Sequence, residues 1–212
     1  MSQTSLADRL EAGLQQLGID LSAADCQAHL LHYLDLLQRW NRSYNLTAIR
    51  DPREMVTRHL LDSLSVLPWI ESGRLLDAGT GAGLPGVPLA ICRPQLELTL
   101  LDSAGKKIRF LNHVRRELGL SNAMPVQQRL EQFVTEQGAQ QVISRAFSSL
   151  ADFVAAARHL GAVRLLAMKG KYPREEIAGL PTWVEVESVE KLAVPGLQED
   201  RHLVIMSGTD EA

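Results

Sequence analysis

The 212-residue sequence predicts a doubly wound α/β fold with a mostly parallel sheet, a helical extension before it and an antiparallel hairpin after it. From Arg74 onward, short apolar runs alternate with helical patterns. A glycine-rich segment follows the first of these runs, where an open α/β sheet binds its ligand. Two further apolar runs near the C-terminus are separated by Pro195-Gly196 and a polar turn.

The first seventy residues predict helices. Leucines recur at helical spacing near the start, at Leu6, Leu10, Leu14 and Leu17. Ser22 and Asp25 have the spacing of a capping box, and an apolar helical stripe follows them. Asp51 predicts the cap of another helix, with Pro52 at its first position. We therefore expect residues 1–70 to form a helical extension.

The rest of the chain predicts a sheet with helical crossovers in one compact unit, residues 71–212. Five parallel strands are expected at Leu75–Ala78, Leu96–Leu101, Met124–Gln127, Gln141–Ser144 and Val163–Met168. The intervening helices are expected at Val87–Cys92, Lys106–Leu118, Leu130–Glu136 and Leu150–His159. The hairpin strands are expected at Val184–Val194 and His202–Ser207.

Composition narrows the class of protein. Hydrophobic residues make up 45% of the chain, enough for a core, but no apolar run approaches the roughly 20 residues that span a bilayer. The N-terminus has no basic start and apolar stretch of a secretory signal, so we expect a cytoplasmic protein. Cys26 and Cys92 lack metal-ligand spacing, so each is interpreted as a small buried hydrophobe, and no metal is expected.

The net charge of −3 argues against a protein that coats nucleic acid nonspecifically, but the charges are segregated. Five basic residues and no acidic one lie within residues 106–116: Lys106, Lys107, Arg109, Arg115 and Arg116. A second basic segment runs from Arg145 to Arg174. Such segregation permits an RNA-binding face on an acidic protein. Charge alone favours ordinary solvated helix faces over an RNA-binding face.

The glycine-rich segment predicts a nucleoside-cofactor site. Gly79, Gly81 and Gly83 follow Asp77, and glycines let the backbone turn sharply and approach a ligand closely. Asp102 ends the next predicted strand, where an acid can accept hydrogen bonds from both ribose hydroxyls of an adenosine. We expect these glycines and Asp102 to contact the cofactor.

Two cofactors fit this pattern. Gly81-x-Gly83-x-x-Gly86 matches a dinucleotide fingerprint, so a nicotinamide dinucleotide is one alternative. The carboxylate of Asp77 favours S-adenosylmethionine, because it suits an ammonium and a sulfonium but repels a pyrophosphate. Leu130 and Glu131, after the third strand, either contact the adenine through their backbone or begin a helix.

The end of the fourth strand, Ser144-Arg145, faces the transferred group in this architecture. Enzymes that methylate amino groups of nucleic acids have an Asn/Asp-Pro-Pro-aromatic motif at this point, and none occurs here. Enzymes that methylate cytosine C5 use a cysteine that follows a proline, and neither Cys26 nor Cys92 does so. Guanine N7 fits as acceptor, because it offers a lone pair and carries no proton. Arg145 has the alternative role of pairing with a nearby carboxylate, and His59 that of a hydrogen-bonded core histidine.

Several stretches together resemble the glucose-inhibited division protein B family, also called RsmG. They are Trp40-Asn41-x-x-x-Asn45-Leu46-Thr47-Ala48, His59-Leu60-Leu61-Asp62-Ser63-Leu64, the segment from Asp77 to Ala90, Leu101-Asp102-Ser103, Lys106-Lys107, Phe110-Leu111, Ser144-Arg145-Ala146 and Lys169-Gly170. The resemblance implies a class I methyltransferase fold and methyl transfer from S-adenosylmethionine to a guanine N7 in bacterial 16S ribosomal RNA.

The resemblance also implies site residues and partners. It places Gly79, Leu84, Leu130, Glu131 and Arg145 at the cofactor and Asp102 at its ribose. Arg145 and Lys169 would shape the active site, with Asn45, His59 and Asp62 near the RNA entrance. Lys107 stands where the family pattern has an arginine. The expected partner is ribosomal RNA or the small ribosomal subunit, and the expected state is a monomer.

Two other functions stay open on sequence grounds. One is a methyltransferase of the same fold that acts on a small molecule or a protein. The other is a module that binds the cofactor or RNA without transferring a methyl group. The basic segments disfavour a small-molecule or protein substrate, because they can supply the phosphate contacts that an RNA enzyme needs. The intact glycine segment and the acid at residue 102 disfavour a module that transfers no methyl group.

Overall fold

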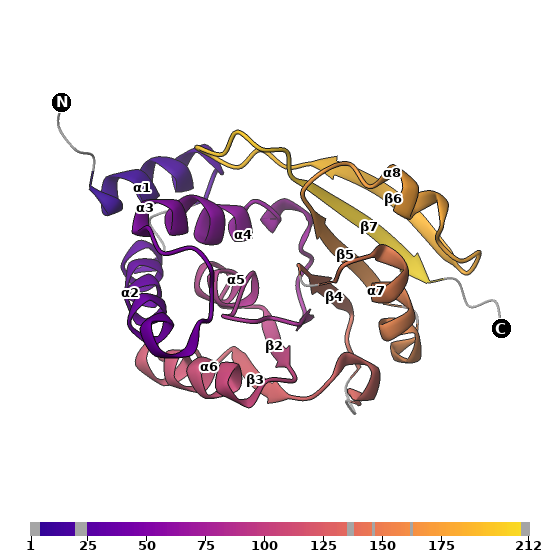
Figure 1. Cartoon of the computed structure of the whole chain (residues 1–212), viewed down its shortest axis with the longest axis horizontal. Coiled ribbons are helices and arrows are strands. Elements are labelled where there is room, and N and C mark those ends of the chain that lie inside the picture. Colours follow the sequence, from indigo (N-terminus) through magenta and orange to yellow (C-terminus); the bar gives the residue numbers. More distant parts are fainter. Residues whose placement is uncertain (1–4, 20–24, 135–137, 146, 162, 209–212) are drawn as a thin grey trace.

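A computed structural model describes residues 5–19, 25–134, 138–145, 147–161 and 163–208. This part of the chain contains a seven-stranded sheet of order β3-β2-β1-β4-β5-β7-β6 with helices on both faces (Figure 1). The strands are β1 (Arg74–Ala78), β2 (Glu97–Asp102), β3 (Ala123–Gln127), β4 (Gln141–Ser144), β5 (Arg164–Lys169), β6 (Val184–Lys191) and β7 (His202–Gly208). Strands β1 to β5 are parallel, and β7 pairs antiparallel with both β5 and β6, which confirms the predicted sheet.

The helices fall close to the predicted positions. They are α1 (Leu6–Gln16), α2 (Cys26–Tyr44), α3 (Pro52–Met55), α4 (Asp62–Leu64), α5 (Gly86–Cys92), α6 (Gly105–Glu117), α7 (Leu150–Ala157) and α8 (Arg174–Ala178). Short turns complete them: the π-helix η1 (Val56–Leu61) and the 3-10 turns η2 (Leu67–Trp69), η3 (Leu130–Gln132) and η4 (Arg158–Leu160). Within the ranges given above, no helix is both long and apolar enough to cross a membrane.

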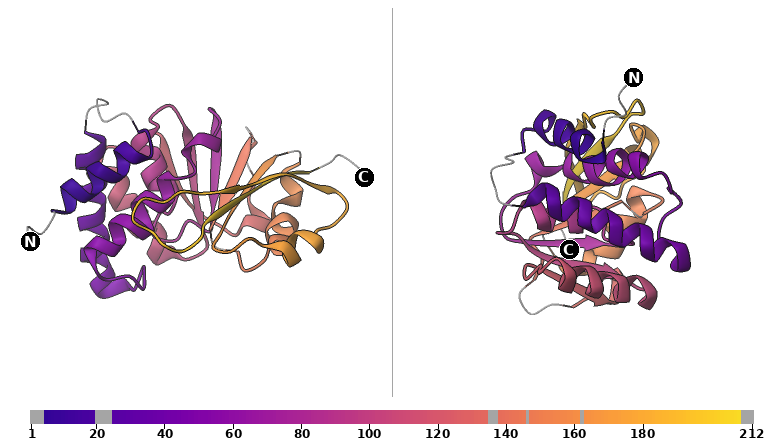
Figure 2. Two further views of the ribbon diagram at one scale, coloured as in Figure 1. Left: turned by 90° about the horizontal axis from the view of Figure 1, so that it is seen from above. Right: turned by 90° about the vertical axis from the view of Figure 1, so that its left-hand side faces the viewer.

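Two apolar cores lie on opposite faces of the sheet, because successive strand residues point to opposite sides. On β5, Leu166 and Met168 belong to one core, and Leu165 and Ala167 belong to the other. The first core also contains the buried faces of α1, α2, α5 and α6, and the second contains α7. Figure 2 shows the N-terminal helices packed against one side of the sheet. The division at residue 70 remains a prediction, since the first core extends across it.

The helix starts agree with the sequence in part. Asp51 caps α3 as predicted, and its Oδ1 accepts a hydrogen bond from the Arg53 backbone N–H at 2.8 Å. Ser22 of the predicted capping box lies outside the described residues, and Asp25 precedes α2 at φ 70° without a side-chain cap. A capping box that was not predicted from the sequence, Ser5 with Asp8, begins α1.

Two predicted elements are corrected. In place of the helix expected at Leu130–Glu136, residues 130–132 form a 3-10 turn and Phe133 is extended, while residues 135 and 136 lie outside the described part of the chain. The two buried anchors of this turn, Leu130 and Phe133, are three residues apart, a spacing that one 3-10 turn aligns on the same side. The hairpin strand expected to end at Val194 ends at Lys191, because the chain then turns to bury Leu192 and Val194 in the first core.

Candidate active site

The loop between β1 and α5, residues 79–85, is called the glycine loop here. Its glycines have positive φ angles of 71°, 62° and 96° at Gly79, Gly81 and Gly83. A Cβ on Gly83 would lie 2.5 Å from Val87 Cγ2, whereas the nearest atom to a Cβ on Gly81 is 3.9 Å away. Gly83 is therefore needed for packing, and Gly81 leaves open space beside the loop.

Asp77 holds the glycine loop from within. Its Oδ2 accepts hydrogen bonds from Thr80 Oγ1 at 2.6 Å and from the Gly86 backbone N–H at 2.8 Å. The side chain is fully buried, and its Oδ1 has no hydrogen-bond partner among the described residues. Burial raises the pKa of Asp77 to about 6. The carboxylate, whose charge favoured a cationic cofactor over a pyrophosphate, is enclosed because the chain returns at Gly86 to cover it.

Asp102 ends β2 beside this loop, as predicted. Its Oδ2 accepts from the Gly81 backbone N–H and from Lys107 Nζ, each at 3.0 Å, and its Oδ1 accepts from the Ala104 backbone N–H at 2.9 Å. The side chain is 6% exposed. The loop and the acid are therefore bonded to one another, and a ligand would use the lone pairs that remain on the carboxylate.

The expected adenine contacts lie at the same edge of the sheet. Strand β3 pairs with β2 so that Gln127 is opposite Asp102, and η3 follows directly. Leu130 is buried in the second core, and Glu131 is exposed. The first N–H groups of a helical turn have no partner inside it, so both backbone donors can face a ligand.

A separate cavity of about 390 Å³ lies at the carboxyl ends of β4 and β5 and the start of β7. Three arginines line it, Arg58, Arg145 and Arg201, and it is called the arginine pocket here. Lys169 and His202 line it as well. Its walls therefore come from segments that are far apart in the sequence.

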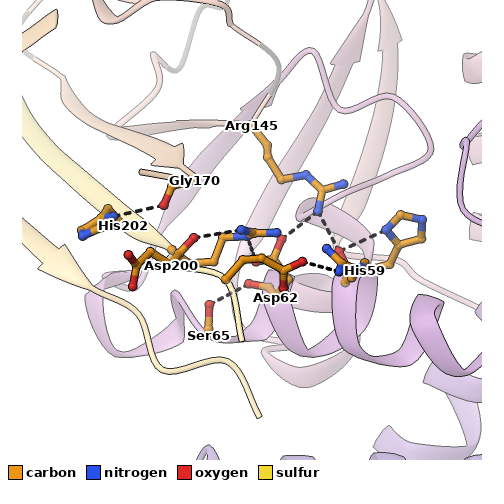
Figure 3. A network of polar contacts seen from close by, with 10 residues as sticks. His59, Asp62, Ser65, Arg145, Gly170, Asp200 and His202 are labelled. Carbon is orange, nitrogen blue, oxygen red and sulfur yellow. Dashed lines mark hydrogen bonds and ion pairs between the residues drawn. The ribbon is translucent and has the colours of Figure 1, made fainter. Parts of the chain in front are cut away.

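Asp62 joins two of these arginines (Figure 3). Its Oδ2 accepts from Arg145 Nη1 at 3.0 Å, and its Oδ1 accepts from Arg201 Nε at 3.1 Å. The carboxylate is 3% exposed, whereas the Arg145 side chain is 28% exposed. Arg145 Nη1 also donates to the Arg58 carbonyl at 3.3 Å. Arg145 is thus both the partner of a carboxylate, as the sequence allowed, and part of the pocket wall.

His59 is a hydrogen-bonded core histidine. Its Nδ1 lies 3.1 Å from the Arg58 carbonyl oxygen and therefore carries the proton. Its Nε2 lies 2.8 Å from Thr47 Oγ1 and accepts from that hydroxyl. Burial, with a smaller effect from the charge of Arg145, lowers the pKa of His59 to about 4. The ring is neutral at pH 7 and both of its nitrogens are engaged.

Lys169 lines the pocket, but its ammonium is paired. Its Nζ donates to Glu176 Oε2 at 2.8 Å and to the Ser148 carbonyl at 3.3 Å. Glu176 Oε2 also accepts from the Leu150 backbone N–H at 2.7 Å, at the start of α7. Lys169 therefore ties the end of β5 to the segment that follows Arg145.

Arg201 and His202 were not predicted from the sequence. His202 Nδ1 donates to the Gly170 carbonyl at 3.2 Å, and His202 pairs in register with Lys169. Only the pairing of β7 with β5 reveals these two residues. Asp62 carried a usable signal, because an acid inside an apolar helical run needs a buried partner.

The five basic residues predicted to bind RNA have separate surroundings on α6. Lys106 Nζ donates to the Tyr44 carbonyl at 3.0 Å, Lys107 pairs with Asp102, and Arg115 Nε donates to the Leu120 carbonyl at 3.3 Å. Arg109 and Arg116 are exposed, and neither forms an ion pair with any residue that the structure describes. The run is therefore not one uniform basic face.

Potential metal ligands are scattered over the fold. Within the structurally described part of the chain, no group of three His, Cys, Asp or Glu side chains could hold a metal ion. Cys26 is buried, as expected, whereas Cys92 is only half-buried, and the two free thiols contact one another at the first core.

Solved structures place this fold in a class. The magnesium protoporphyrin IX methyltransferase ChlM from Synechocystis PCC 6803 aligns with a TM-score of 0.59 at 13% identity, covering 84% of this chain and 97% of that one. TrmN from Thermus thermophilus aligns with a TM-score of 0.54 at 16% identity, covering 72% and 53%. The fold, with its helical extension and its strand order, is that of a class I methyltransferase.

The family follows from sequence similarity. The GidB family, described as rRNA small subunit methyltransferase G, matches residues 26–204. A ribosomal RNA small subunit methyltransferase G from Pseudomonas aeruginosa (strain LESB58) is 55% identical over 206 residues, 96% of each chain. Its counterpart from Salmonella arizonae is 49% identical over 203 residues, covering 95% of this chain and 98% of the relative. The chain belongs to this family, which confirms the resemblance seen in the sequence.

Proposed function

We propose that this protein transfers the methyl group of S-adenosylmethionine to N7 of a guanine in 16S ribosomal RNA. The contact between the two sites carries the proposal. Ser144 Oγ donates to the Ala78 carbonyl at 2.7 Å, so the end of β4 is bonded to the end of β1, where the glycine loop begins. Arg145 follows Ser144 directly, and its charge acts on Asp77 beneath the loop. A cofactor on the loop and a base in the arginine pocket would therefore be neighbours.

The residues at the carboxyl ends of β1, β2 and β3 fit this cofactor. Gly81 leaves the open approach that a Cβ would fill, and Asp102 lies beside it as the ribose acceptor. The proposed contacts are Gly79, Gly81, Gly83, Leu84, Asp102, Leu130, Glu131 and Arg145. The bound cofactor supplies a methyl group activated by its positively charged sulfur. The related fold of ChlM is described with S-adenosylmethionine bound.

The arginine pocket fits guanine. Arginine is a common partner of the guanine edge that carries O6 and N7, and a single N–H donor on O6 leaves the N7 lone pair free to attack. Arg145 Nη1 is occupied by Asp62 and the Arg58 carbonyl, but its remaining donors have no partner in the described part of the chain. In this proposal Arg145 donates to guanine O6 and directs N7 toward the methyl group. Lys169 keeps the segment after Arg145 in place through Glu176.

The protein need not supply a base for this acceptor. Guanine N7 attacks with a lone pair and loses no proton. His59 is neutral and engaged at both ring nitrogens, so it is unsuited to accept one. The contribution of the chain is orientation, which can be worth about 7–11 kcal/mol.

The test is single-turnover methyl transfer to 16S ribosomal RNA, measured against pH. The profile should be flat across the neutral range for wild type, His59→Gln and His202→Gln. Arg145→Ala should lower the rate by about 100-fold, and Arg145→Lys should recover part of it, because an ammonium lacks the planar fork. A limb that disappears in either histidine variant would show a base at work. Recovery of any methylated nucleoside other than 7-methylguanosine would refute the acceptor.

A further inference from the structure

A second cavity, of about 790 Å³, lies on the side of the molecule formed by α2 and α6. It is lined by Trp40 of α2 and by Arg109, His113, Arg115 and Arg116 of α6. None of its lining residues also lines the arginine pocket. In the right-hand view of Figure 2, which faces this side, α2 and α6 lie side by side in front of the sheet.

The cavity runs along α6 from Arg109, two residues after Lys107, to Ser121 beyond the end of the helix. Lys107, near the start of the helix, pairs with Asp102 beside the glycine loop. Arg115 comes eight residues later, about 12 Å along a helix that rises 1.5 Å per residue. Lys107 thus contacts Asp102, whereas the three arginines of the basic run line the cavity.

Two of the three arginines at this cavity are exposed and have no acidic partner among the residues the structure describes. They are Arg109 and Arg116. The nearest acid on the helix is Glu117, whose Oε1 lies 3.9 Å from His113 Nδ1. Arg115 completes the end of the helix through the Leu120 carbonyl, which leaves Arg109 and Arg116 as unpaired cations on a protein of net charge −3.

The cavity also has an aromatic wall. The centroid of the half-buried Trp40 ring lies 5.3 Å from that of His113 and 5.1 Å from that of Tyr44, on which it stacks. Proteins that bind single-stranded nucleic acid combine cations for the backbone with aromatic rings for the bases. A partner protein with an acidic surface would need only the arginines of this cavity and not its aromatic ring.

From this combination we propose that the α2–α6 cavity is a second RNA-binding site, which holds the phosphate backbone of the substrate away from the guanine being methylated. The inference rests on the proposed function for the nature of the substrate. A long RNA would engage both sites at once, and binding at the second site would raise its affinity by effective concentration. A short RNA would occupy the arginine pocket alone.

The test uses the full protein with the double substitution Arg109→Gln and Arg116→Gln, which keeps good helix formers at both positions. Arg42→Gln is the matched control. Arg42 is exposed in the last turn of α2, just as Arg116 is exposed in the last turn of α6. Because Arg42 lies two positions from Trp40, the two side chains point to different sides of α2. Affinity is measured by fluorescence anisotropy at several salt concentrations, for 16S ribosomal RNA fragments and for short single-stranded oligonucleotides containing the target guanine.

The double variant should bind the long RNA at least about tenfold more weakly, since each charged hydrogen bond is worth roughly that much. The slope of log affinity against log salt should fall by about 0.7 for each phosphate of a single strand that the variant no longer neutralises. Binding of the short RNA and of S-adenosylmethionine should stay within twofold of wild type, and Arg42→Gln should change none of these.

Three results would overturn the second site: equal weakening of long and short RNA, unchanged binding of the long RNA, or an equal effect of Arg42→Gln. Sedimentation showing that the arginines hold two copies of the chain together would assign the cavity to self-association instead. The outcome is separable from the proposed function. If wild type binds the long RNA through these arginines but transfers no methyl group, the proposed function fails and the binding site stands.

Discussion

The glycine loop and the arginine pocket lie next to one another but are built in opposite ways. Twelve consecutive residues, Leu75 to Gly86, contain the loop and the acid that holds it. The pocket instead depends on Asp62, which pairs with Arg145 83 residues away and with Arg201 139 residues away. The difference shows that a loop between neighbouring elements can be specified locally, whereas a pocket lined by distant segments depends on the whole sheet.

Asp62→Asn should have the largest effect and should separate the two regions. It leaves Arg145 and Arg201 without their shared counter-charge, and a displaced guanidinium can reduce the single-turnover rate by about 100-fold. The free energy of unfolding should fall by about 3 kcal/mol in urea titrations, the low end for a broken buried pair because both arginines are partly exposed.

The control is Asp35→Asn, which breaks the exposed Asp35–Arg39 pair on α2 and should cost at most about 0.5 kcal/mol. Cofactor affinity, measured by calorimetry, should be unchanged in both variants. If Asp62→Asn weakened the cofactor as much as it slowed transfer, the two regions would form one unit and the comparison would be wrong.

Two alanine substitutions compare a glycine of the loop that is packed against side chains with one that borders open space. Gly83→Ala combines a positive φ with close approach to Val87 and Leu111, and should lower the free energy of unfolding by about 3 kcal/mol. Gly81→Ala also has a positive φ but meets open space, so its stability cost should be about 1–2 kcal/mol. Its main effect should be weaker cofactor binding, seen by calorimetry. Similar unfolding costs with unchanged binding would contradict the division of roles.

The smallest effect concerns the pH dependence of stability. The folded pKa of His59, about 4, lies below its unfolded value near 6.5, so stability falls as pH drops between these values. The folded pKa of Asp77, about 6, lies above its unfolded value near 3.9, so its contribution is lost as pH rises. Between pH 4 and 6 the two groups oppose one another.

His59→Gln should therefore expose the slope due to Asp77, with stability decreasing by on the order of 2 kcal/mol from pH 4 to 6. Asp77→Asn should expose the reverse slope. Urea unfolding of each variant across this range is the measurement. Parallel pH profiles for the two variants would show that other groups control the dependence.

The sequence could predict the features that depend on neighbours along the chain. Glycine spacing, strand–helix alternation and the acid at the end of β2 are local, and the structure places all three as expected. The position of Asp77 was also evident, but its role was not. Its charge favoured a cationic cofactor over a pyrophosphate, and only the return of the chain at Gly86 shows that the carboxylate is buried.

The tertiary structure alone decided which charges meet. Packing and strand pairing place Asp62 between Arg145 and Arg201, His202 opposite Lys169, and Trp40 beside the arginines of α6. Periodicity along a chain states which residues are buried, because burial follows from the face of a helix or strand. It does not state which buried groups become partners, because that depends on the sheet order and register that bring distant segments together.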